Sequence, residues 1–536
     1  MISSIFGWKI RSKQRAIIRA ERKLKENSGI KKLSDLKRSL SDQKLNIEFG
    51  IFSSFVMGNM IGNNIKEVCI RQYLLIRFSG LKFNKRLLFH KANEDDQIGY
   101  SVPPEWRFIL MENGFKVSKW RSAVMWNSNL LLLLFYGIYQ AIIVIYCSLM
   151  GLRNNGQTVR PHVFFCKLEP RNLPSVNKEK VSYDIINWYI KNAPNESKFD
   201  VIKHDVCGVN STLINGKVIE PSPAGPVPHL DSIKSISSFS IWFLLAALVC
   251  FIDLLRGRWW HALIFSESII SKKASLINPK YFAEEYYFHQ SNPTYRPLWT
   301  YVAEKCGSSI SLYFYSINME SINLDPSYHF RCMTWSRYLV WDQYTENFIR
   351  RCIKEEQKPE IEIVGSIWFN NSGDTKLPEK ANNIIIFDVV PHRPLSSSLH
   401  LDENLYVTLE NCNKFIVDVV NIAGQKNLTC WYKGKRDLGI RKINKRYKTT
   451  VDTLSKKSEF VTLSHEIAPH EIIPLCSVVI CFPFSAPAVI ARELGIPSCY
   501  YDPTGMIDEH HPAAHGITII GNKINLQNWV KAKMLC

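Results

Sequence analysis

The hydrophobic pattern is most distinct near the C-terminus, where two short apolar runs flank a segment with helical character. The first run covers residues 478–481 and leads into a turn at 482–487 that is rich in proline and small residues. The following segment ends at Gly495, and a second apolar run begins there. This order predicts strand, turn, helix and strand, which is one βαβ unit of a parallel sheet.

Ligands of open parallel sheets bind at the carboxyl ends of the strands. The turn 482–486 and the segment 500–505 are therefore expected to border one site. The helix after the turn would direct unpaired backbone N–H groups at that site, which favours an anionic ligand. The alternative is a buried βαβ unit with no ligand.

Alternating strand and helix patterns extend this unit into two α/β regions. In the first, we predict strands at 162–168, 199–206, 285–290, 309–316, 338–342 and 361–366, with helices at 182–192 and 298–306 and from 343 through Arg351. In the second, we predict strands at 383–390, 427–432 and 460–463, and a helix over about 403–424. A polar stretch at 370–382 separates the regions. We therefore predict an N-terminal helical region at 1–153, an α/β domain at 154–366 and a second one at 367–536.

Two apolar runs interrupt this pattern. No charged residue lies between Arg121 and Arg153, and about 20 apolar residues suffice to cross a hydrocarbon core of about 30 Å. Residues 129–152 could therefore cross a membrane or form a buried helix. The second run, 239–252, is shorter and favours an interfacial or core helix. The strands between the runs need partners that follow the second run, so we expect a monotopic arrangement without export of the intervening segment.

Charge and cysteine content narrow the functional classes. The 536 residues carry a formal net charge of +19, and residues 1–44 hold a large share of the excess, in a segment that we expect to be helical over 9–45. Such a basic segment could contact nucleic acid or an anionic membrane surface. The chain has no zinc-finger, RRM or basic-zipper pattern, which argues against nucleic acid. Fourteen cysteines without C-x-x-C spacing indicate reduced thiols in a cytosolic setting.

The C-terminal motif resembles that of a known family. Phe482-Pro483-Phe484-Ser485-Ala486-Pro487-Ala488, together with the residues after it up to Pro503, is similar to the signature of bacterial polysaccharide-biosynthesis proteins named for a PFTS motif. Here Ser485 follows Phe484 directly, so the threonine of the motif is absent. Segments 314–318 and 339–344 also resemble this family. The resemblance implies two Rossmann-like domains in a GT-B glycosyltransferase arrangement.

The resemblance also implies a nucleotide-sugar donor held by the second domain. Its phosphate would lie near a loop after a predicted strand end and near the turn before the helix, while an acid on the helix could hold the ribose. Each of these residues could instead be an ordinary surface, capping or turn residue. The expected donor contacts are Lys433, Lys435, Arg436, His465, Glu466, Ser485, Ala486, Glu493, Tyr501 and Asp502.

An acceptor hydroxyl must lose its proton during an inverting transfer, and in GT-B enzymes the base usually belongs to the first domain. His289, Asp205 and Asp342 are candidates, because each lies at or just after a predicted strand end. Each could equally be a hydrogen-bonded structural residue. No cofactor besides the donor substrate is expected. The histidine-rich segment 508–515 lacks metal-ligand spacing and is expected to be a loop at the cleft rather than a metal site. GT-B enzymes are usually independent of metal.

The resulting hypothesis is a glycosyltransferase at the cytoplasmic face of the inner membrane, peripheral or monotopic. It would move a sugar from a nucleotide donor, for which a CMP-activated acid is one option, to a surface polysaccharide or lipid-linked precursor. Its partners would be nucleotide sugar, glycan acceptor and membrane lipid, without nucleic acid. The alternatives are a nucleotide-sugar epimerase of similar two-domain shape and a non-catalytic membrane scaffold for polysaccharide assembly.

Overall fold

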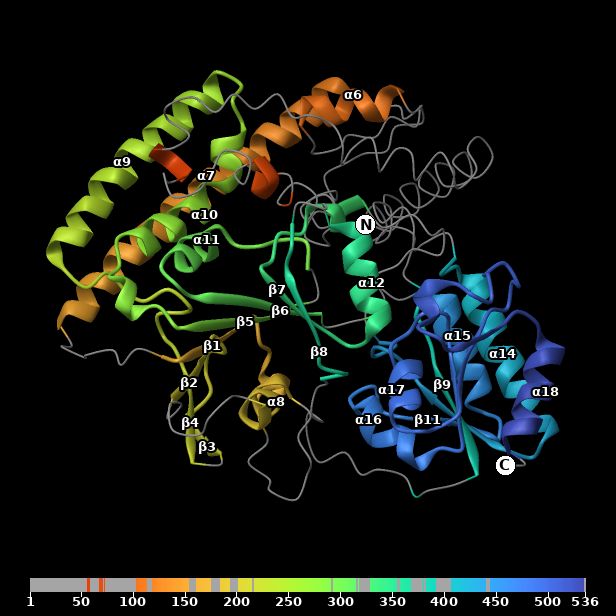
Figure 1. Ribbon diagram of the computed structural model, residues 1–536. Helices are drawn as coiled ribbons and strands as arrows, with labels where there is room; N and C mark the ends of the chain where they lie inside the picture. The colour runs from red at the N-terminus through yellow and green to blue at the C-terminus, as the bar shows by residue number, and fades with distance from the viewer. Residues whose placement is uncertain are drawn as a thin grey trace, which may run out of the picture.

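Two sheets organise the computed structural model (Figure 1). The structure describes residues 55–57, 67–70, 72, 103–112, 118–153, 161–174, 184–192, 201–214, 216–290, 293–314, 317, 328–353, 357–367, 379, 382–391, 406–439 and 444–534. The expectations for residues 1–44, for the helix at 9–45 and for most of the linker at 370–382 lie outside these residues. The predicted pair of α/β domains is confirmed, because one sheet lies on each side of that linker.

The second sheet has six parallel strands in the order β11-β10-β9-β12-β13-β14. The strand order reverses direction between β9 and β12, which is the Rossmann pattern. β9 and β12 are continuous apolar runs because helices cover both of their faces. The strands are β9 (Asn383–Phe387), β10 (Thr429–Lys433), β11 (Phe460–Thr462), β12 (Val478–Cys481), β13 (Ser498–Tyr501) and β14 (Thr518–Ile520).

The first sheet has eight strands in the order β3-β4-β2-β1-β5-β6-β7-β8, and only β3 is antiparallel to its neighbour. Here the strand order reverses between β1 and β5. The strands are β1 (Val163–Cys166), β2 (Val201–His204), β3 (Thr212–Ile214), β4 (Lys217–Pro221), β5 (Glu285–Gln290), β6 (Ser309–Phe314), β7 (Arg337–Val340) and β8 (Glu360–Ile363).

Helices connect and cover the strands of both sheets. In the first domain and before it, the structure has α6 (Pro104–Glu112), α7 (Lys119–Arg153), α8 (Ile185–Asn192), α9 (Ile233–Leu255), α10 (Trp260–Ser275), α11 (Leu298–Lys305) and α12 (Gln343–Cys352). In the second domain it has α14 (Leu409–Gln425), α15 (Lys445–Leu454), α16 (Pro469–Ile472), α17 (Pro487–Glu493) and α18 (Lys523–Met534).

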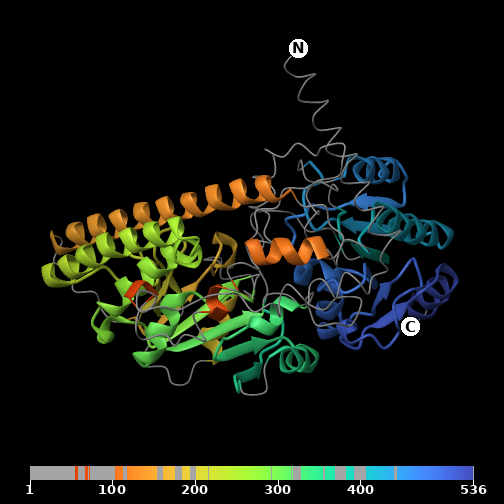
Figure 2. The same ribbon diagram turned by 90° about the horizontal axis from the view of Figure 1, so that it is seen from above.

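One face of the first sheet carries two helical layers. Alternate side chains of β1 and β5, such as Phe164 and Tyr286, face the core that contains α10 and α11. Helices α7 and α9 pack on the outer side of α10, and Figures 1 and 2 show them as the outermost long helices of this domain. On the opposite face, Phe165 and Tyr287 pack against Tyr189 of α8. The apolar helix of the N-terminal region therefore packs on the first α/β domain and does not form a separate unit.

Several elements differ from the sequence expectations. The apolar run at 239–252 is part of α9, which has 23 residues and begins at Ile233 because Ser232 caps it. The β3–β4 hairpin, β14 and the helices α10, α15 and α18 were not predicted. The sequences of α10 and α18 lack a strong helical period, whereas α15 has one, with Tyr447, Val451 and Leu454 buried on one face. α17 has only seven residues.

Candidate functional site

The carboxyl ends of β9, β10 and β12 come together at the point where the second sheet reverses its strand order. The backbone N–H of Phe482 donates to the carbonyl of Phe387 at 2.9 Å, which joins the end of β12 to the end of β9. β10 pairs with β9 on the other side, with Lys433 opposite Phe387. Ligands of open α/β sheets bind at such a position.

Asp388 is the buried centre of this edge. Its carboxylate accepts hydrogen bonds from the hydroxyls of Tyr432, at 2.7 Å, and Tyr447, and from the backbone N–H of Lys435 at 3.3 Å. Burial raises the pKa of Asp388, while these hydrogen bonds and the positive charge of Lys433 oppose the rise. The carboxylate thereby holds together the ends of two strands, the loop after β10 and helix α15.

Lys433 is the buried cation of the edge. Its Nζ donates to the carbonyl of His465 at 3.3 Å and lies 5.9 Å from the ring centre of Phe387. Burial lowers the pKa of Lys433 to about 8, although Asp388 favours the charged form. Burial disfavours the charged form of this ammonium group, so an anion bound beside it would stabilise that form strongly. This is the group at the edge best suited to a phosphate.

The turn after β12 is held by its own backbone. Ser485 donates from its backbone N–H, at 3.2 Å, and from its hydroxyl, at 3.0 Å, to the carbonyl of Phe482. Phe484 has a φ of 63°, a conformation unusual for a residue with a side chain, and its ring lies 4.7 Å from that of His511. The N–H groups of Ala488 and Val489 bond to Ser485 and Ala486. The expected anion site at the helix N-terminus therefore has few unused donors.

The remaining donor candidates on this side lie around Lys433. Lys435 is exposed and Arg436 half-buried in the loop after β10, while His465 and Glu466 are exposed in the loop after β11. These two loops follow neighbouring strands, so the structure brings four of the predicted residues to one end of the sheet. Their contacts with a donor stay predictions.

Tyr501 and Asp502 serve the fold at the next strand end. Asp502 is buried and accepts from the hydroxyl of Tyr406, from the backbone N–H and hydroxyl of Thr504, and from the N–H of Ile507. The hydroxyl of Tyr501 donates to Asp418 of α14 at 2.8 Å. Both side chains thus form hydrogen bonds with neighbouring residues of the second domain, and none of the hydrogen bonds described for them involves Lys433.

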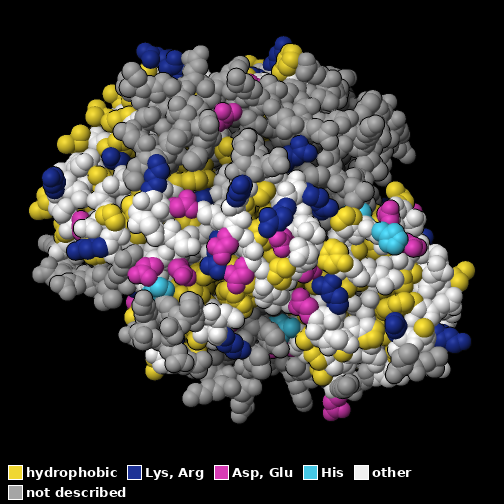
Figure 3. Space-filling model, viewed as in Figure 1, with side chains coloured by type: hydrophobic (Ala, Val, Ile, Leu, Met, Phe, Trp, Pro, Cys, Tyr) yellow, Lys and Arg dark blue, Asp and Glu magenta, His cyan; other side chains and the backbone are white. Residues whose placement is uncertain are grey.

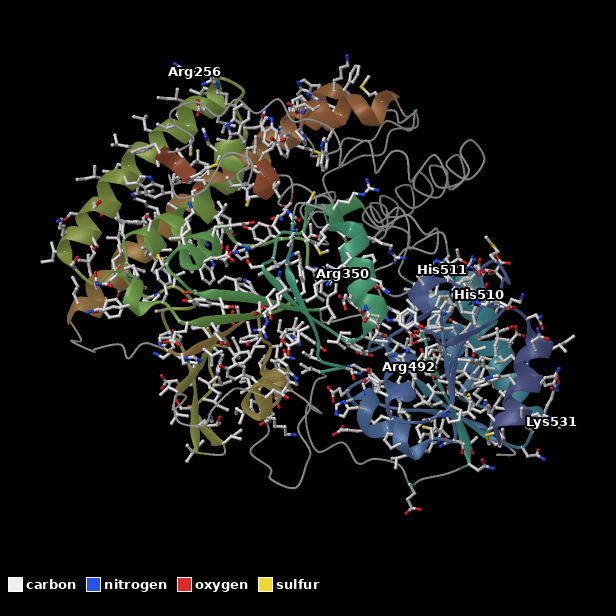
Figure 4. The ribbon with its side chains drawn as sticks, viewed as in Figure 1. Arg256, Arg350, Arg492, His510, His511 and Lys531 are labelled. Carbon is white, nitrogen blue, oxygen red and sulfur yellow. The ribbon has the colours of Figure 1, made fainter. Side chains whose placement is uncertain are left out.

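Glu493 and Asp342 each contact a residue of the other domain. Ser366, which follows β8, donates to the carboxylate of Glu493. Asp342 caps α12, and its carboxylate lies 3.1 Å from Nη2 of Arg492 and 2.9 Å from Nδ1 of His515. Figure 4 shows Arg492 on the side of the second domain that faces the first.

This position gives Asp342 a structural role. Burial alone would raise the pKa of Asp342, but hydrogen bonds from His515, Thr345 and Arg492 hold it well below its usual range. A carboxylate that is so hard to protonate is a poor general base. The geometry accordingly favours Asp342 as a link between the domains. Glu493, at the end of α17, contacts Ser366 of the first domain and is not part of the edge that carries Lys433.

The other two base candidates lie at the switch point of the first sheet. Asp205 accepts from the backbone N–H groups of Lys167, at 2.7 Å, and Leu168, at 3.2 Å, which stabilises the φ of 63° at Lys167. Burial raises the pKa of Asp205 against these hydrogen bonds. β1 lies between β2 and β5, so the structure places Asp205 and His289 two strands apart, roughly 10 Å by strand spacing.

His289 is the more promising base. Its ring is buried and stacks on that of Tyr313, with centroids 5.4 Å apart and planes 16° from parallel. The hydroxyl of Tyr313 in turn donates to the carbonyl of Ile367 at 3.0 Å, in the segment that leads to the second domain. His289 therefore lies on the face of the sheet from which the chain passes to the second domain.

Sequence reasoning did not identify Asp388, Tyr447 or His515 as site residues. Asp388 directly follows an apolar strand, which is a usable signal for a strand-end residue. The tyrosine and the histidine reach their partners from 59 and 173 positions away, so no local pattern could reveal them. Within the described parts of the chain, no three histidine, cysteine or acidic side chains group together as metal ligands.

The fold and this edge define a class of protein with two Rossmann-like domains in the GT-B arrangement. The family model of the polysaccharide biosynthesis PFTS motif proteins matches residues 239–530, more than half of the chain. The chain belongs to this family, as its motif at 482–488 indicated. The match begins within α9, includes β5–β8 of the first domain and covers nearly all of the second.

Solved structures with the same general architecture are distant. The Anabaena protein HepE, in complex with UDP and glucose, has a TM-score of 0.35 and 10% identity, over 70% of this chain and 89% of that one. The wall teichoic acid polymerase TagF gives 0.33 and 10%, over 76% and 91%. A search of curated protein sequences gave no match. Structural similarity at this level does not indicate a function. The function is inferred from the family and from the site.

Proposed function

We propose that this protein is a glycosyltransferase that moves a sugar from a nucleotide donor to a surface polysaccharide or its lipid-linked precursor. Membership of a polysaccharide biosynthesis family supports this reaction class. The observation that carries the proposal is the buried Lys433 beside Asp388 at the switch point of the second sheet. A buried ammonium at the usual ligand position fits the phosphate of a nucleotide sugar.

In the proposed complex, Lys433 contacts the donor phosphate, and Lys435, Arg436 and the turn at Ser485–Ala486 border the nucleotide. The exposed His465 and Glu466 would contact its outer part. Asp388 would touch no substrate and would act by holding the end of β10, which carries Lys433, and the loop that carries Lys435. A donor with a single phosphate, such as a CMP-activated acid, is one option for a site with one buried cation.

On the first domain, His289 is proposed as the base that removes the proton from the acceptor hydroxyl. Its buried ring has a fixed orientation because it stacks on Tyr313. Asp205 is the second candidate, because burial raises its pKa toward the range of a useful base. The enzyme would work as a peripheral or monotopic protein at the cytoplasmic face of the inner membrane, where lipid-linked glycans are assembled.

A panel of nucleotides and nucleotide sugars, screened by thermal shift and followed by a transfer assay with membrane lipid extracts, tests the proposal. We expect one nucleotide class to raise the melting temperature and its sugar to appear on a lipid or glycan acceptor. Conversion of the free nucleotide sugar without transfer would instead identify an epimerase. Absence of any nucleotide binding would favour a non-catalytic scaffold.

A further inference from the structure

Helices α7 and α9 expose a continuous apolar surface on the side away from the sheet. The exposed side chains recur every three or four residues along each helix, so they lie on one face of each. We call this surface the α7–α9 face; it consists of Leu132, Phe135, Tyr139, Ile142, Tyr146, Leu149, Ile241, Leu244, Leu248, Phe251 and Leu255. Figure 3 shows apolar side chains projecting along the edge over α9.

The inner faces of the same helices are fixed to the protein. Leu130 and Ala141 of α7, and Phe239 and Ala246 of α9, are fully buried. A Cβ on Gly137 would lie 2.4 Å from the ring of Phe265, so α7 and α10 approach each other closely. Neither helix can be surrounded by lipid without losing this packing.

The charges of the helix pair are arranged as at a bilayer surface. No charged residue occurs in 122–152 or 235–252. The single acid of α9, Asp253, is buried, with its carboxylate 2.7 Å from Nδ1 of His261 and 3.7 Å from Arg258. Exposed cations lie at the ends, Lys119 at the start of α7 and Arg256 at the end of α9, where Figure 4 shows it.

Sheet topology rules out a crossing hairpin. If α7 and α9 both crossed a bilayer, the strands between them would lie on the side opposite β5. β1 and β5, however, pair directly, with Val163 opposite Glu285 and Cys166 opposite Phe288. This pairing excludes any crossing by α9. Gln72, which precedes α7, hydrogen-bonds to Arg296 and Thr334 of the first domain, so α7 does not cross alone either.

We propose that the α7–α9 face lies in the plane of a membrane, inserted among the headgroups and upper acyl chains of an anionic leaflet. The apolar side chains enter the lipid, and Lys119, Arg256 and other basic residues contact the headgroups. This inference deepens the membrane setting of the proposed function and does not depend on sugar transfer. Vesicle binding without any nucleotide sugar tests it separately.

The first test is flotation of the full chain with vesicles of phosphatidylcholine containing a third phosphatidylglycerol. The double variant Phe135→Glu/Leu248→Glu should bind at least about tenfold more weakly, because two exposed apolar side chains no longer enter lipid. Leu213→Glu is the matched control, since Leu213 is 68% exposed on β3, away from the face, and it should bind normally. Unchanged vesicle binding by the double variant would overturn the proposal. So would a wild-type dimer in size-exclusion chromatography that the double variant disrupts without a change in lipid binding.

The second test uses Cys207, whose thiol is exposed and which lies in the segment of the chain that connects α7 to α9. A membrane-impermeant maleimide should label Cys207 in inside-out membrane vesicles and leave it unlabelled in right-side-out vesicles. The Cys207→Ser variant identifies the signal. Labelling in right-side-out vesicles would show that the segment crosses the membrane and would overturn the in-plane arrangement.

Discussion

The two sheets share the Rossmann strand order but differ in the charges at their carboxyl ends. At the second sheet, Asp388 and Lys433 are buried together, and the cation is held at a cost. At the first sheet, the carboxylate of Asp205 accepts hydrogen bonds from two backbone N–H groups, and the ring of His289 stacks on that of Tyr313. The same topology therefore gives one edge suited to an anion and one edge that holds a buried histidine in a fixed orientation.

Replacement of Asp388 is expected to have the largest effect. Asp388→Asn weakens an acceptor for three donors and leaves Lys433 without its counter-charge, so unfolding free energy should fall by about 3 kcal/mol. Asp205→Asn, which affects two backbone donors at a half-buried position, should cost about 1–2 kcal/mol. Denaturant unfolding of the two variants compares the edges directly. Equal losses would contradict the difference described above.

The next largest effect is expected at Lys433. Lys433→Met keeps the length of the side chain and removes the charge, so affinity for the donor nucleotide should fall about 30-fold, as expected for a charge-assisted hydrogen bond of about 2 kcal/mol. Lys435→Met removes an exposed charge and should cost about threefold. Calorimetric titration of both variants measures this. A larger loss of affinity in Lys435→Met than in Lys433→Met would show that the phosphate contacts the loop after β10 and not Lys433.

The depressed pKa of Lys433 predicts a pH dependence of donor binding. Burial lowers this pKa to about 8, so the free protein loses the ammonium above that pH, while a bound phosphate favours the charged form. Affinity should therefore be nearly constant below pH 7 and fall by up to about tenfold per pH unit above pH 8. Lys433→Met should lose this dependence. A wild-type affinity that does not change between pH 7 and 9 would show that the ammonium does not contact the phosphate.

A smaller effect is expected at the domain boundary. Asp342→Asn retains a side chain that can cap α12 but removes the charge facing Arg492 and His515, so stability at pH 7 should fall by about 1–2 kcal/mol. The folded pKa of Asp342 is depressed, so its contribution is present above the usual pKa of about 3.9 and is lost as the pH falls below it. Thermal unfolding should show a difference between wild type and variant that is steady from pH 7 down to about pH 4 and shrinks as the pH falls further. A constant difference would assign the effect to capping.

The sequence was most informative where a local pattern determines structure. The apolar runs at 383–390 and 478–481 predicted central parallel strands, because helices cover both of their faces. The motif around Ser485 indicated the family and the strand end next to which Asp388 lies. The predicted strands at 427–432 and 460–463 are present as β10 and β11, which pair with each other.

Long-range contacts could not be predicted in this way. The sequence offers no signal that Tyr447 reaches Asp388, or that Asp342 and Glu493 contact the other domain, because these contacts depend on how separate elements pack. The apolar run 239–252 is shorter than α9, so the predicted helix was too short. Its first turns, Ile233–Phe239, mix serine with apolar residues, and only the packing on α10 reveals which face is buried.

In the proposed enzyme, the second sheet binds the donor nucleotide and the first sheet supplies the base. Calorimetric titration of the donor nucleotide into Lys433→Met and His289→Ala, paired with a transfer assay on each, tests this division most directly. We predict that Lys433→Met loses most donor affinity, whereas His289→Ala binds the donor like the wild type and transfers its sugar at least about 100-fold more slowly. Normal donor binding by Lys433→Met, or loss of donor binding by His289→Ala, would contradict the account.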